Sequence, residues 1–345
     1  MLVFDGIIFS LQHNGGISVY FHELLSRFAR LQCESMVLMF GDNEISRQQT
    51  TKLAREMPTS RFLERCRSVP VKGYGVFHSS YYRYATQGQF LNIGTVYDFT
   101  NERFKFGPRK WVHSWQKFTA IRHYDAVICI SESTKADLHE YLPDIPESRV
   151  YVTPLAASEA FCVDDAVVPI EDYVVFVGLR GGYKNFALLV RALRLVPGVR
   201  LFVVGGGKFT AQELAELENA IPGRYFHQGY LSVERLRDLY RRALCLVYPS
   251  AYEGFGLPVL EAMLARCPVV ALRTSSIPEV AGDAAVLLDS PQERDLADAI
   301  VAVSAPSMRG ELVARGLIRS RQFSWDATYL KTRAVYETVL GHALR

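Results

Sequence analysis

Two glutamates eight positions apart are the residues of this chain best suited to chemistry. Glu253 and Glu261 stand in the segment YPSAYEGFGLPVLEAM, where glycines flank Phe255 and Pro258 falls in the first turn of an expected helix, a position that favours proline. The N-terminus of a helix offers unpaired amides to anions or hydroxyl oxygens. The segment therefore predicts that the two carboxylates bind hydroxyls at two ends of one polyol ligand. The alternative is that each carboxylate is only solvated or paired locally.

Cations and glycines at other strand ends could hold a diphosphate. Arg180 and Lys184 lie in a glycine-rich loop after an expected strand, where two fixed positive charges would neutralise a leaving diphosphate, although most Arg and Lys are simply exposed. Gly15 and Gly16 open an expected helix, and their amides can approach a phosphate without interference from a Cβ. The chain has no Asp-any-Asp pair, so no divalent metal site of that kind is expected.

The elements that must position these residues alternate between short β-branched or aromatic runs and longer segments of helical period, which is typical of parallel sheets with crossover helices. The strands expected in the first half are 2–10, 36–40, 76–78, 93–97, 126–130 and 150–153, with helices at 16–31 and 111–123. In the second half they are 173–179, 200–204, 225–228, 244–248, 269–272 and 285–288, with helices at 185–195, 210–219, 233–242, 256–265 and 292–303.

The two series predict two doubly wound α/β domains. The join falls in residues 154–172, which have no clear period, and we place the boundary near residue 168. Open α/β sheets bind ligands at the carboxyl ends of their strands, so the functional residues are expected in the loops that follow strands. The three consecutive glycines 205–207 lack the spacing of a dinucleotide-binding loop and predict an ordinary turn.

Composition and charge restrict the class of protein. The chain has 345 residues, of which 49% are hydrophobic and 22% charged, as in folded globular proteins. Its net charge of +3 does not argue for nucleic acid as a partner, and no apolar run reaches the roughly 20 residues that a membrane-spanning helix needs. The six cysteines are scattered, which favours reduced thiols. We expect a cytoplasmic protein that neither spans a membrane nor is secreted.

The segment from Glu253 to Glu261 closely resembles the signature of family 4 retaining glycosyltransferases, which have the GT-B fold of two facing Rossmann-like domains. Residues 15–17 resemble the family's N-terminal glycine loop, 178–185 its loop with a phosphate-binding Arg and Lys, and 227–232 the loop near the donor base. The resemblance implies an acceptor-binding domain at 1–168, a donor-binding domain at 169–325, and a helix at 326–345 that crosses back to the first domain.

The resemblance also implies a role for each site residue in transferring a sugar from a nucleotide diphosphate donor with retention of configuration. Glu261 would bind the ribose, Glu253 the sugar hydroxyls, and Arg180 and Lys184 the diphosphate, so that catalysis is mostly electrostatic. Neither a cofactor nor a metal is expected. The other donor-binding residues would be Gly15, Gly16, Tyr230, Leu231, Gly254, Phe255, Gly256 and Leu257.

One loop departs from the family pattern. The segment TVYDFTNERF resembles the loop in which many relatives carry His-Asp, with the His facing the donor sugar, but here Tyr97 stands at the His position. This leaves Asp98 as the polar group carried over as a catalytic candidate. The alternative is that Asp98 caps a turn.

Two basic stretches in the first half suggest a membrane interface. Residues 47–72 hold seven Lys or Arg, and residues 103–122 hold six, interleaved with Trp111, Trp115 and other aromatic residues. Such a surface suits an anionic bilayer or a lipid-diphosphate acceptor. Because Trp and Phe at helical spacing usually pack on a sheet, we favour residues 47–72 over the Trp-bearing helix for contact with the inner face of the plasma membrane.

The resemblance implies synthesis of a surface polysaccharide or O-antigen, with a lipid-linked or other oligosaccharide acceptor. We favour GDP-mannose or a GDP-deoxyhexose such as rhamnose as the donor, with a UDP-hexose next. Two other functions stay open, a GT-B nucleotide-sugar epimerase and a non-catalytic sugar-nucleotide binding module. An epimerase would make its product without an acceptor, and a binding module would not turn over any donor.

Overall fold

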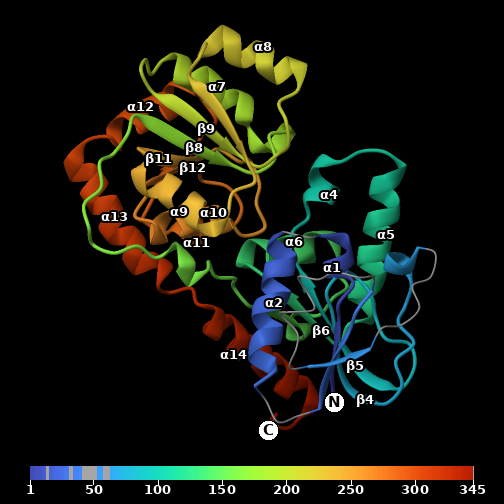
Figure 1. The fold of residues 1–345 in the computed structure, drawn as a ribbon. Helices are drawn as coiled ribbons and strands as arrows, with labels where there is room; N and C mark the ends of the chain where they lie inside the picture. Colours follow the sequence, from blue (N-terminus) through green and yellow to red (C-terminus); the bar gives the residue numbers. More distant parts are fainter. Residues whose placement is uncertain (13–14, 31–33, 41–52, 57–62, 345) are drawn as a thin grey trace. The chain divides into compact units, whose positions relative to one another are not determined.

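The structure, a computed structural model, describes residues 1–12, 15–30, 34–40, 53–56 and 63–344. The chain divides into two compact units. The first comprises Met1–Leu155 together with Ser324–Arg345, and the second comprises Ala156–Phe323. Each unit is an α/β domain built on one parallel sheet, as the alternating sequence pattern predicts (Figure 1).

The first unit is built on a seven-stranded parallel sheet in the order β3-β2-β1-β4-β5-β6-β7. The central strands are almost wholly apolar and are covered on both faces, as expected for a parallel sheet. For example, every residue of β6 is buried, and Ile93 of β5 pairs with Ala126 of β6. The strands are β1 (Leu2–Asp5), β2 (Ser35–Leu38), β3 (Ala54–Glu56), β4 (Tyr74–Ser79), β5 (Gln89–Val96), β6 (Ala126–Cys129) and β7 (Val150–Val152).

Helices cover this sheet, and most follow directly from strand ends. The α-helices are α1 (Ile8–Leu11), α2 (Gly16–Phe28), α4 (Thr100–Phe104), α5 (Pro108–His123) and α6 (Glu132–Tyr141), with the C-terminal α14 (Trp325–Leu340). Helix α14 packs beside α2, and the two are seen together in blue and red in Figure 1. Its Tyr336 hydroxyl lies 2.5 Å from Nδ1 of His78 on β4, and its ring stacks on Phe28 of α2 at 5.2 Å.

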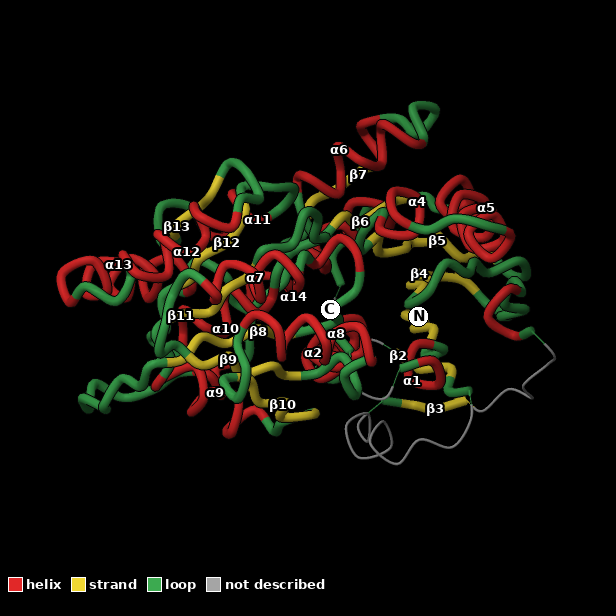
Figure 2. The backbone as a smooth tube through the Cα atoms, turned by 90° about the horizontal axis from the view of Figure 1, so that it is seen from above, coloured by secondary structure: helices red, strands yellow, loops and turns green. Residues whose placement is uncertain are grey.

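The second unit is built on a six-stranded parallel sheet in the order β10-β9-β8-β11-β12-β13, drawn in yellow in Figure 2. The strands are β8 (Tyr173–Val177), β9 (Arg200–Val204), β10 (Tyr225–Gly229), β11 (Cys245–Tyr248), β12 (Val269–Leu272) and β13 (Val286–Leu288). The α-helices are α7 (Phe186–Arg194), α8 (Ala211–Ala220), α9 (Val233–Arg242), α10 (Leu257–Leu264), α11 (Ile277–Ala281), α12 (Glu293–Ala302) and α13 (Pro306–Ser320).

The core of the second unit forms where α7, α8 and α12 pack on one face of this sheet. Leu189 and Leu193 of α7 and Ile300 of α12 are fully buried against Val203 and Val247 of the sheet. The strand order reverses between β8 and β11, and this is the point where open sheets of this kind bind ligands.

The domain boundary lies earlier in the chain than the sequence predicts. The structure divides the chain after Leu155 rather than near residue 168, because the intervening segment packs on the second unit. The Phe161 ring lies 6.2 Å from the Tyr240 ring of α9, and the Glu171 amide donates to the carbonyl of Arg242 at 2.9 Å.

The first strand is shorter than predicted. The sequence predicts a strand over 2–10, but β1 ends at Asp5 and α1 begins at Ile8. The Asp5 carboxylate accepts a hydrogen bond from the Ile7 amide at 3.2 Å, which turns the chain out of the sheet. The sequence analysis also missed β3, α6, α11 and α13.

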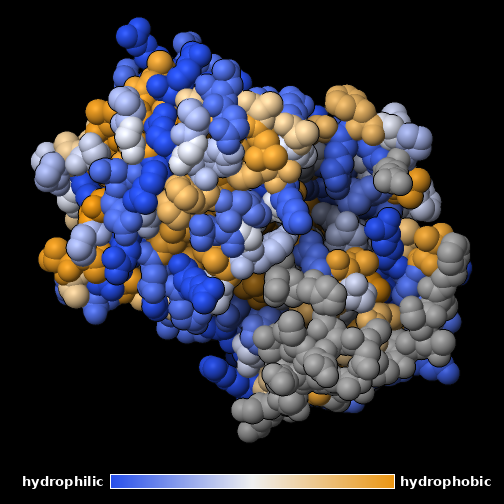
Figure 3. Space-filling model, turned by 45° about the horizontal axis from the view of Figure 1, so that its top comes forward, coloured by the Kyte–Doolittle hydropathy of each residue, from blue (hydrophilic) through white to orange (hydrophobic). Residues whose placement is uncertain are grey.

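The surface is mixed, with hydrophobic residues scattered between hydrophilic ones on the face drawn in Figure 3. Such a distribution is ordinary for a folded protein. Among the described cysteines, Cys66, Cys129, Cys162, Cys245 and Cys267 are free thiols. In the described part of the chain, no helix has both the length and the apolar character that crossing a bilayer requires.

Candidate active site

The loop that carries Glu253 follows β11 and is fastened at several points along its backbone. The side-chain amide of Asn185 donates to the Pro249 carbonyl at 2.9 Å, and the Thr274 hydroxyl donates to the Ser250 carbonyl at 2.9 Å. The Ser275 hydroxyl accepts from the Glu253 amide at 2.8 Å, and the Ser276 hydroxyl lies 2.9 Å from the carbonyls of Glu253 and Phe255. The Glu253 side chain is therefore presented from a rigid loop.

The turn from this loop into α10 depends on Gly256. Its φ of 105° lies in the left-handed region, and a Cβ there would come 2.8 Å from Cδ1 of the buried Ile277. Phe255 beside it is buried and contacts Phe323 edge-on at 5.8 Å. The backbone of residues 254–257 thus leads into the first turn of α10, in which Pro258 has no N–H and the Val259 amide donates to the Gly256 carbonyl at 3.0 Å.

Lys184 and Glu253 form an ion pair. Nζ of Lys184 lies 2.6 Å from Oε1 of Glu253, and the two side chains are 12% and 11% exposed. Lys184 ends the 3-10 turn η4 (Gly182–Lys184) after β8, and its Nζ lies 5.5 Å from the centre of the Tyr248 ring. Burial and the neighbouring Glu253 carboxylate hold the pKa of Tyr248 well above its ordinary value. Two predicted site residues from different strand ends are therefore in direct contact.

Glu261 lies on α10 below this pair and is held in a poorly solvated place. Its Oε2 accepts a hydrogen bond from the hydroxyl of the buried Tyr240 on α9, at 3.5 Å. Burial raises the pKa of Glu261 to about 7, and the hydrogen bond from Tyr240 offsets this only in part. A carboxylate in such a place is destabilised until it gains hydrogen-bond donors, which ligand hydroxyls can supply.

The guanidinium of Arg180 is bound by acceptors of the protein itself. The sequence predicts a cation facing a diphosphate, but the guanidinium is buried and every one of its nitrogens has a protein acceptor. Nε donates to Glu213 at 2.8 Å, Nη1 to the carbonyls of Gly205 and Gly207 at 3.2 and 3.1 Å, and Nη2 to that of Lys208 at 2.8 Å. In the structure Arg180 holds a loop, and its predicted contact with a diphosphate stays a prediction.

That loop is the glycine triplet 205–207, for which the sequence predicts an ordinary turn. Gly205, Gly206 and Gly207 have φ values of 80°, 74° and 70°. A Cβ on Gly206 would come 2.6 Å from Nη1 of Arg180, so glycine is required by the close approach of the guanidinium. The triplet therefore supplies backbone carbonyls, those of Gly205 and Gly207, that accept hydrogen bonds from Arg180.

The loop predicted to lie near the donor base follows β10 and adjoins this glycine triplet. The Gly205 amide donates to the carbonyl of Gly229 at 2.7 Å, and Nε2 of His227 lies 3.0 Å from the carbonyl of Gly205. Tyr230 is 81% exposed and Leu231 is half-buried. Both are accessible at a strand end of the donor unit, and their contact with a base stays a prediction.

Gly15 and Gly16 lie in the first unit, at the N-terminus of α2. Gly15 is the N-cap, its amide donates to the Ser18 hydroxyl at 3.0 Å, and that hydroxyl donates back to the Gly15 carbonyl at 2.8 Å. Gly16 is exposed at the first helical position. This geometry suits an anion at the helix N-terminus, and the predicted phosphate contact is untested.

Tyr97 and Asp98 follow β5 of the same unit. Oδ1 of Asp98 accepts from the Thr100 amide at 2.9 Å, so the carboxylate closes a turn just before α4, and its catalytic role stays a prediction. Tyr97 is buried, and its hydroxyl donates to the carbonyl of Ser80 at 3.4 Å. The side chain that replaces the usual histidine is thus part of the packed interior of the unit.

The comparisons with known proteins agree with this arrangement. A family model described as Glycosyltransferase Family 4 matches residues 14–157, and one described as Glycosyl transferases group 1 matches residues 166–308. The chain belongs to these glycosyltransferase families. The first match contains Gly15, Gly16 and Asp98, and the second contains Arg180, Lys184, Glu253 and Glu261.

Two mannosyltransferases are among the relatives of this glycosyltransferase. O-antigen chain mannosyltransferase B from Escherichia coli is 31% identical over 230 residues, which are 61% of this chain and 60% of that protein. Serotype-specific mannosyltransferase WbdA from the same organism is 27% identical over 249 residues, 66% of this chain and 30% of WbdA. The match thus spans less than two thirds of either relative.

Solved structures show that the glycosyltransferase has the GT-B fold. Sucrose-phosphate synthase from Thermosynechococcus elongatus superposes with a TM-score of 0.74 at 16% identity, over 99% of both chains. HepE from Anabaena, solved with UDP and glucose, superposes with a TM-score of 0.71 at 15% identity, over 98% of this chain and 99% of that one. The predicted fold class is confirmed.

Sequence reasoning missed the residues that support the site of this glycosyltransferase. Thr274, Ser275 and Ser276 follow β12, and a polar triplet at a strand end was a usable signal for the loop support that they provide. Glu213 and Tyr240 gave no such signal, because each is a helical residue whose partner is far away in the sequence.

Proposed function

We propose that this glycosyltransferase moves mannose, or a deoxyhexose such as rhamnose, from a GDP-sugar to a lipid-linked saccharide with retention of anomeric configuration. The observation that carries the proposal is the largely buried Lys184–Glu253 ion pair, which joins the loop after β8 to the loop after β11. A bound donor would break this ion pair. Its diphosphate would then contact Lys184, and its sugar hydroxyls would contact Glu253. The mannose assignment is supported by the two mannosyltransferase relatives.

The remaining donor contacts are assigned along the same strand ends. Glu261 binds the ribose hydroxyls, which stabilise a carboxylate whose pKa burial raises to about 7. The backbone of 254–257 binds the sugar, and Tyr230 and Leu231 border the base. Arg180 acts as a positioning residue, because it fastens the glycine triplet 205–207 beside the loop that carries Tyr230.

The reaction proposed is a displacement on one face of the sugar. The bond from the sugar C1 to the diphosphate oxygen breaks, the bond from C1 to the acceptor oxygen forms, and the acceptor proton passes to the departing diphosphate oxygen. Charge grows on the diphosphate as the bond breaks, and Lys184 stabilises that charge more strongly in the transition state than in the ground state. The reaction needs neither a metal ion nor a cofactor in this proposal.

The acceptor is proposed to be a lipid-linked oligosaccharide of surface polysaccharide or O-antigen synthesis, bound by the first unit at the cytoplasmic face of the membrane. In that unit Gly16 begins α2, and Asp98 lies just after β5. This part of the proposal is supported by the similarity to O-antigen chain mannosyltransferase B.

The test is transfer of radiolabelled sugar from GDP-mannose, GDP-rhamnose and UDP-glucose to a lipid-linked saccharide, with and without EDTA. The proposal predicts labelled product with a GDP-sugar, unchanged by EDTA, with the donor's anomeric configuration in the product by NMR. Lys184→Met serves as the inactive control. Conversion of the donor without any acceptor would identify an epimerase, and saturable binding without turnover would identify a binding module.

A further inference from the structure

The N-terminal half of helix α5 has its large apolar residues on the outside. Trp111 is 74% exposed, Trp115 66% and Val112 55%, and these three residues share the outward face of the helix. In the preceding connection Phe106 is 88% exposed, and Phe104 at the end of α4 is 37% exposed. The sequence analysis favoured packing of the Trp rings on the sheet, and for Trp111 and Trp115 that expectation is wrong.

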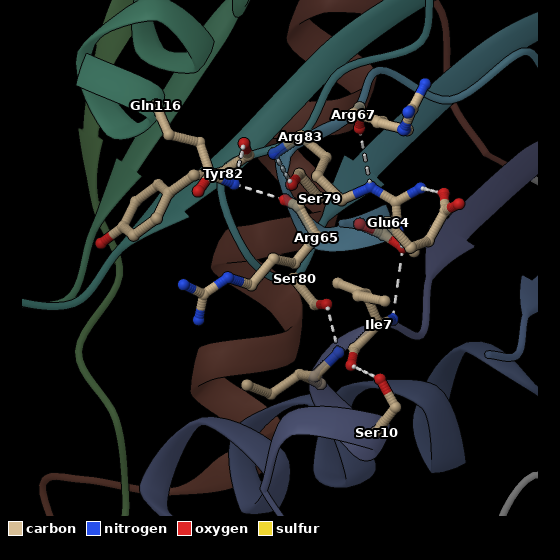
Figure 4. A network of polar contacts seen from close by, with 12 residues as sticks. Ile7, Ser10, Glu64, Arg65, Arg67, Ser79, Ser80, Tyr82, Arg83 and Gln116 are labelled. Atoms are coloured by element: carbon tan, nitrogen blue, oxygen red, sulfur yellow. Dashed lines mark hydrogen bonds and ion pairs between the residues drawn. The ribbon is translucent and has the colours of Figure 1, made fainter. Parts of the chain in front are cut away.

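Opposite the Trp rings, the inward face of α5 is polar, and the apolar residues that α5 buries, Ala120 and Ile121, lie in its last turns. The Ser114 hydroxyl donates to Oε1 of Glu102 at 2.8 Å, and Nζ of Lys117 donates to Oε2 of Glu102 at 3.1 Å and to the carbonyl of Asp98 at 2.5 Å. The Gln116 amide donates to the carbonyls of Arg65 and Tyr82, as drawn in Figure 4. All three side chains of α5 are buried.

These contacts fix which way α5 faces. Burial lowers the pKa of Lys117, while the Glu102 carboxylate raises it, and the Lys117 ammonium lies 3.5 Å from the centre of the Phe99 ring. Burial alone would raise the pKa of Glu102, but hydrogen bonds from His113 and Ser114 together with Lys117 lower it to about 2. Turning the helix to bury its Trp rings would break these bonds, and buried charges are costly once unpaired. The aromatic side must therefore face outward.

The charges around the exposed rings are positive. Lys105 is exposed, and Nζ of Lys110 lies 5.6 Å from the centre of the Phe106 ring. Within the described residues, neither lysine has a carboxylate partner. The carboxylates of Asp137 and Glu140 pair with Arg103 of α4, and that of Asp144 pairs with Arg122 of α5.

We propose that the α4–α5 aromatic surface, formed by Phe104, Phe106, Trp111, Val112 and Trp115 with Lys105 and Lys110, docks on an anionic lipid bilayer. Trp and Phe rings lie favourably at the headgroup level, and lysines beside them gain from anionic headgroups. A protein partner would suit the rings equally but not the excess of unpaired lysines. This contact names the membrane partner of the first unit and deepens the proposed function, yet it does not depend on catalysis.

The chain contains its own probe for this contact. It has three tryptophans, and Trp111 and Trp115 lie on the surface while Trp325 is 5% exposed. Vesicles of phosphatidylcholine with about one third phosphatidylglycerol should shift the tryptophan emission to the blue. They should also protect the tryptophans from quenching by acrylamide. Pure phosphatidylcholine vesicles should bind more weakly, and added salt should reduce the difference.

Variants separate the rings from the charges in a vesicle flotation assay. Trp111→Ala with Trp115→Ala should weaken binding by on the order of a hundredfold, since each large ring removed from contact costs roughly tenfold. Lys105→Glu with Lys110→Glu should abolish the preference for anionic vesicles. Tyr74→Ala is the matched control, because Tyr74 of β4 in the same unit is also 74% exposed, and its binding should equal that of the wild type.

Other outcomes would overturn the proposal. Equal flotation of the wild type and the double Trp variant would do so, provided that circular dichroism shows both folded. Absence of vesicle binding, with concentration-dependent self-association that the Trp substitutions abolish, would assign the surface to a second copy of the chain. Since nucleotide binding belongs to the second unit, these results leave the donor site to be tested separately.

Discussion

Two lysine–glutamate pairs of this glycosyltransferase differ in how completely they are satisfied. The pair Lys117–Glu102 is sealed, with side chains 1% and 3% exposed, and Lys117 has the Asp98 carbonyl as a second acceptor. In the pair Lys184–Glu253 both side chains are partly accessible, and among the described residues Glu253 is the one acceptor of the Lys184 ammonium. A saturated pair fixes structure, whereas a pair with hydrogen-bonding capacity left over can exchange its partner for a ligand.

The same difference separates two parts of the molecule. Under α5, buried polar contacts determine which way an aromatic surface faces. At the strand ends of the second unit, polar contacts hold a loop so that its carboxylate remains available. The account therefore assigns the sealed pair to stability and the open pair to binding.

The largest effect expected concerns stability. Lys117→Met should destabilise the first unit by about 3–5 kcal/mol, because it leaves the Glu102 carboxylate buried without its cation. Lys184→Met should cost less, about 1–3 kcal/mol, because the Glu253 side chain keeps a small exposed fraction of 11% whereas that of Glu102 is 3%. Urea unfolding of both variants measures this, and equal losses would erase the distinction between the pairs.

The next effect concerns turnover. Lys184→Ala should lower kcat by about 10²–10³-fold, the range typical for loss of one group that stabilises transition-state charge. Affinity for the free nucleoside should change far less. Steady-state kinetics with calorimetric binding provides the comparison, and a parallel fall in both would reject the assigned role of Lys184.

Arg180 resembles the sealed pair Lys117–Glu102, because its guanidinium is buried and every nitrogen has a protein acceptor. Arg180→Lys should destabilise the second unit by about 1–3 kcal/mol, since an ammonium cannot satisfy the acceptors of Glu213, Gly205, Gly207 and Lys208 together. Thermal unfolding detects this. Unchanged stability with a large loss of kcat would instead assign Arg180 to the diphosphate, as the sequence predicted.

The buried carboxylate of Glu261 should lower the free energy of unfolding in a pH-dependent way. Its pKa rises from an ordinary 4.5 to about 7 on folding, so the folded chain keeps a proton that the unfolded chain has released between these values. Stability therefore falls as pH rises from about 4.5 to 7 and stays low above. Glu261→Gln should stabilise the protein by about 1–3 kcal/mol at pH 8 and have little effect near pH 4.5. Urea titrations at both pH values test this, and a benefit independent of pH would contradict it.

Much of the fold could be predicted from periodicity. The bounds of β9, α9 and β12 agree with the sequence expectation, because each has a run of uniform pattern between clear turn residues. Helix α6 was missed although Ser131 caps it, since its sequence ESTKADLHEY is too polar to show a periodic apolar face. Helix α13 was missed for the same lack of a continuous apolar stripe.

The site could be predicted less completely. The positions of Lys184, Glu253 and Glu261 follow from strand ends and a helix start, which are local features. The inward turn of Arg180 depends on acceptors 25 to 33 residues further along the chain, and no local pattern encodes them. The spacing of Trp111 and Trp115 predicts a common face but not its direction, which contacts on the opposite face with Glu102 and the Arg65 carbonyl decide. Residues 47–52 and 57–62 of the basic stretch 47–72 lie outside the described residues.

The central claim is that the Lys184–Glu253 pair exchanges its partners for a sugar nucleotide. The most direct test is calorimetric titration of GDP with GDP-mannose, and of UDP with UDP-glucose, into the wild type and Glu253→Gln. The account predicts that the variant binds the sugar nucleotide more weakly, because Glu253 contacts the sugar. It also predicts that the free diphosphate binds at least as tightly as before, because Lys184 is released from its carboxylate. Equal affinities for both ligands in the two proteins, or an equal loss for both, would contradict the claim.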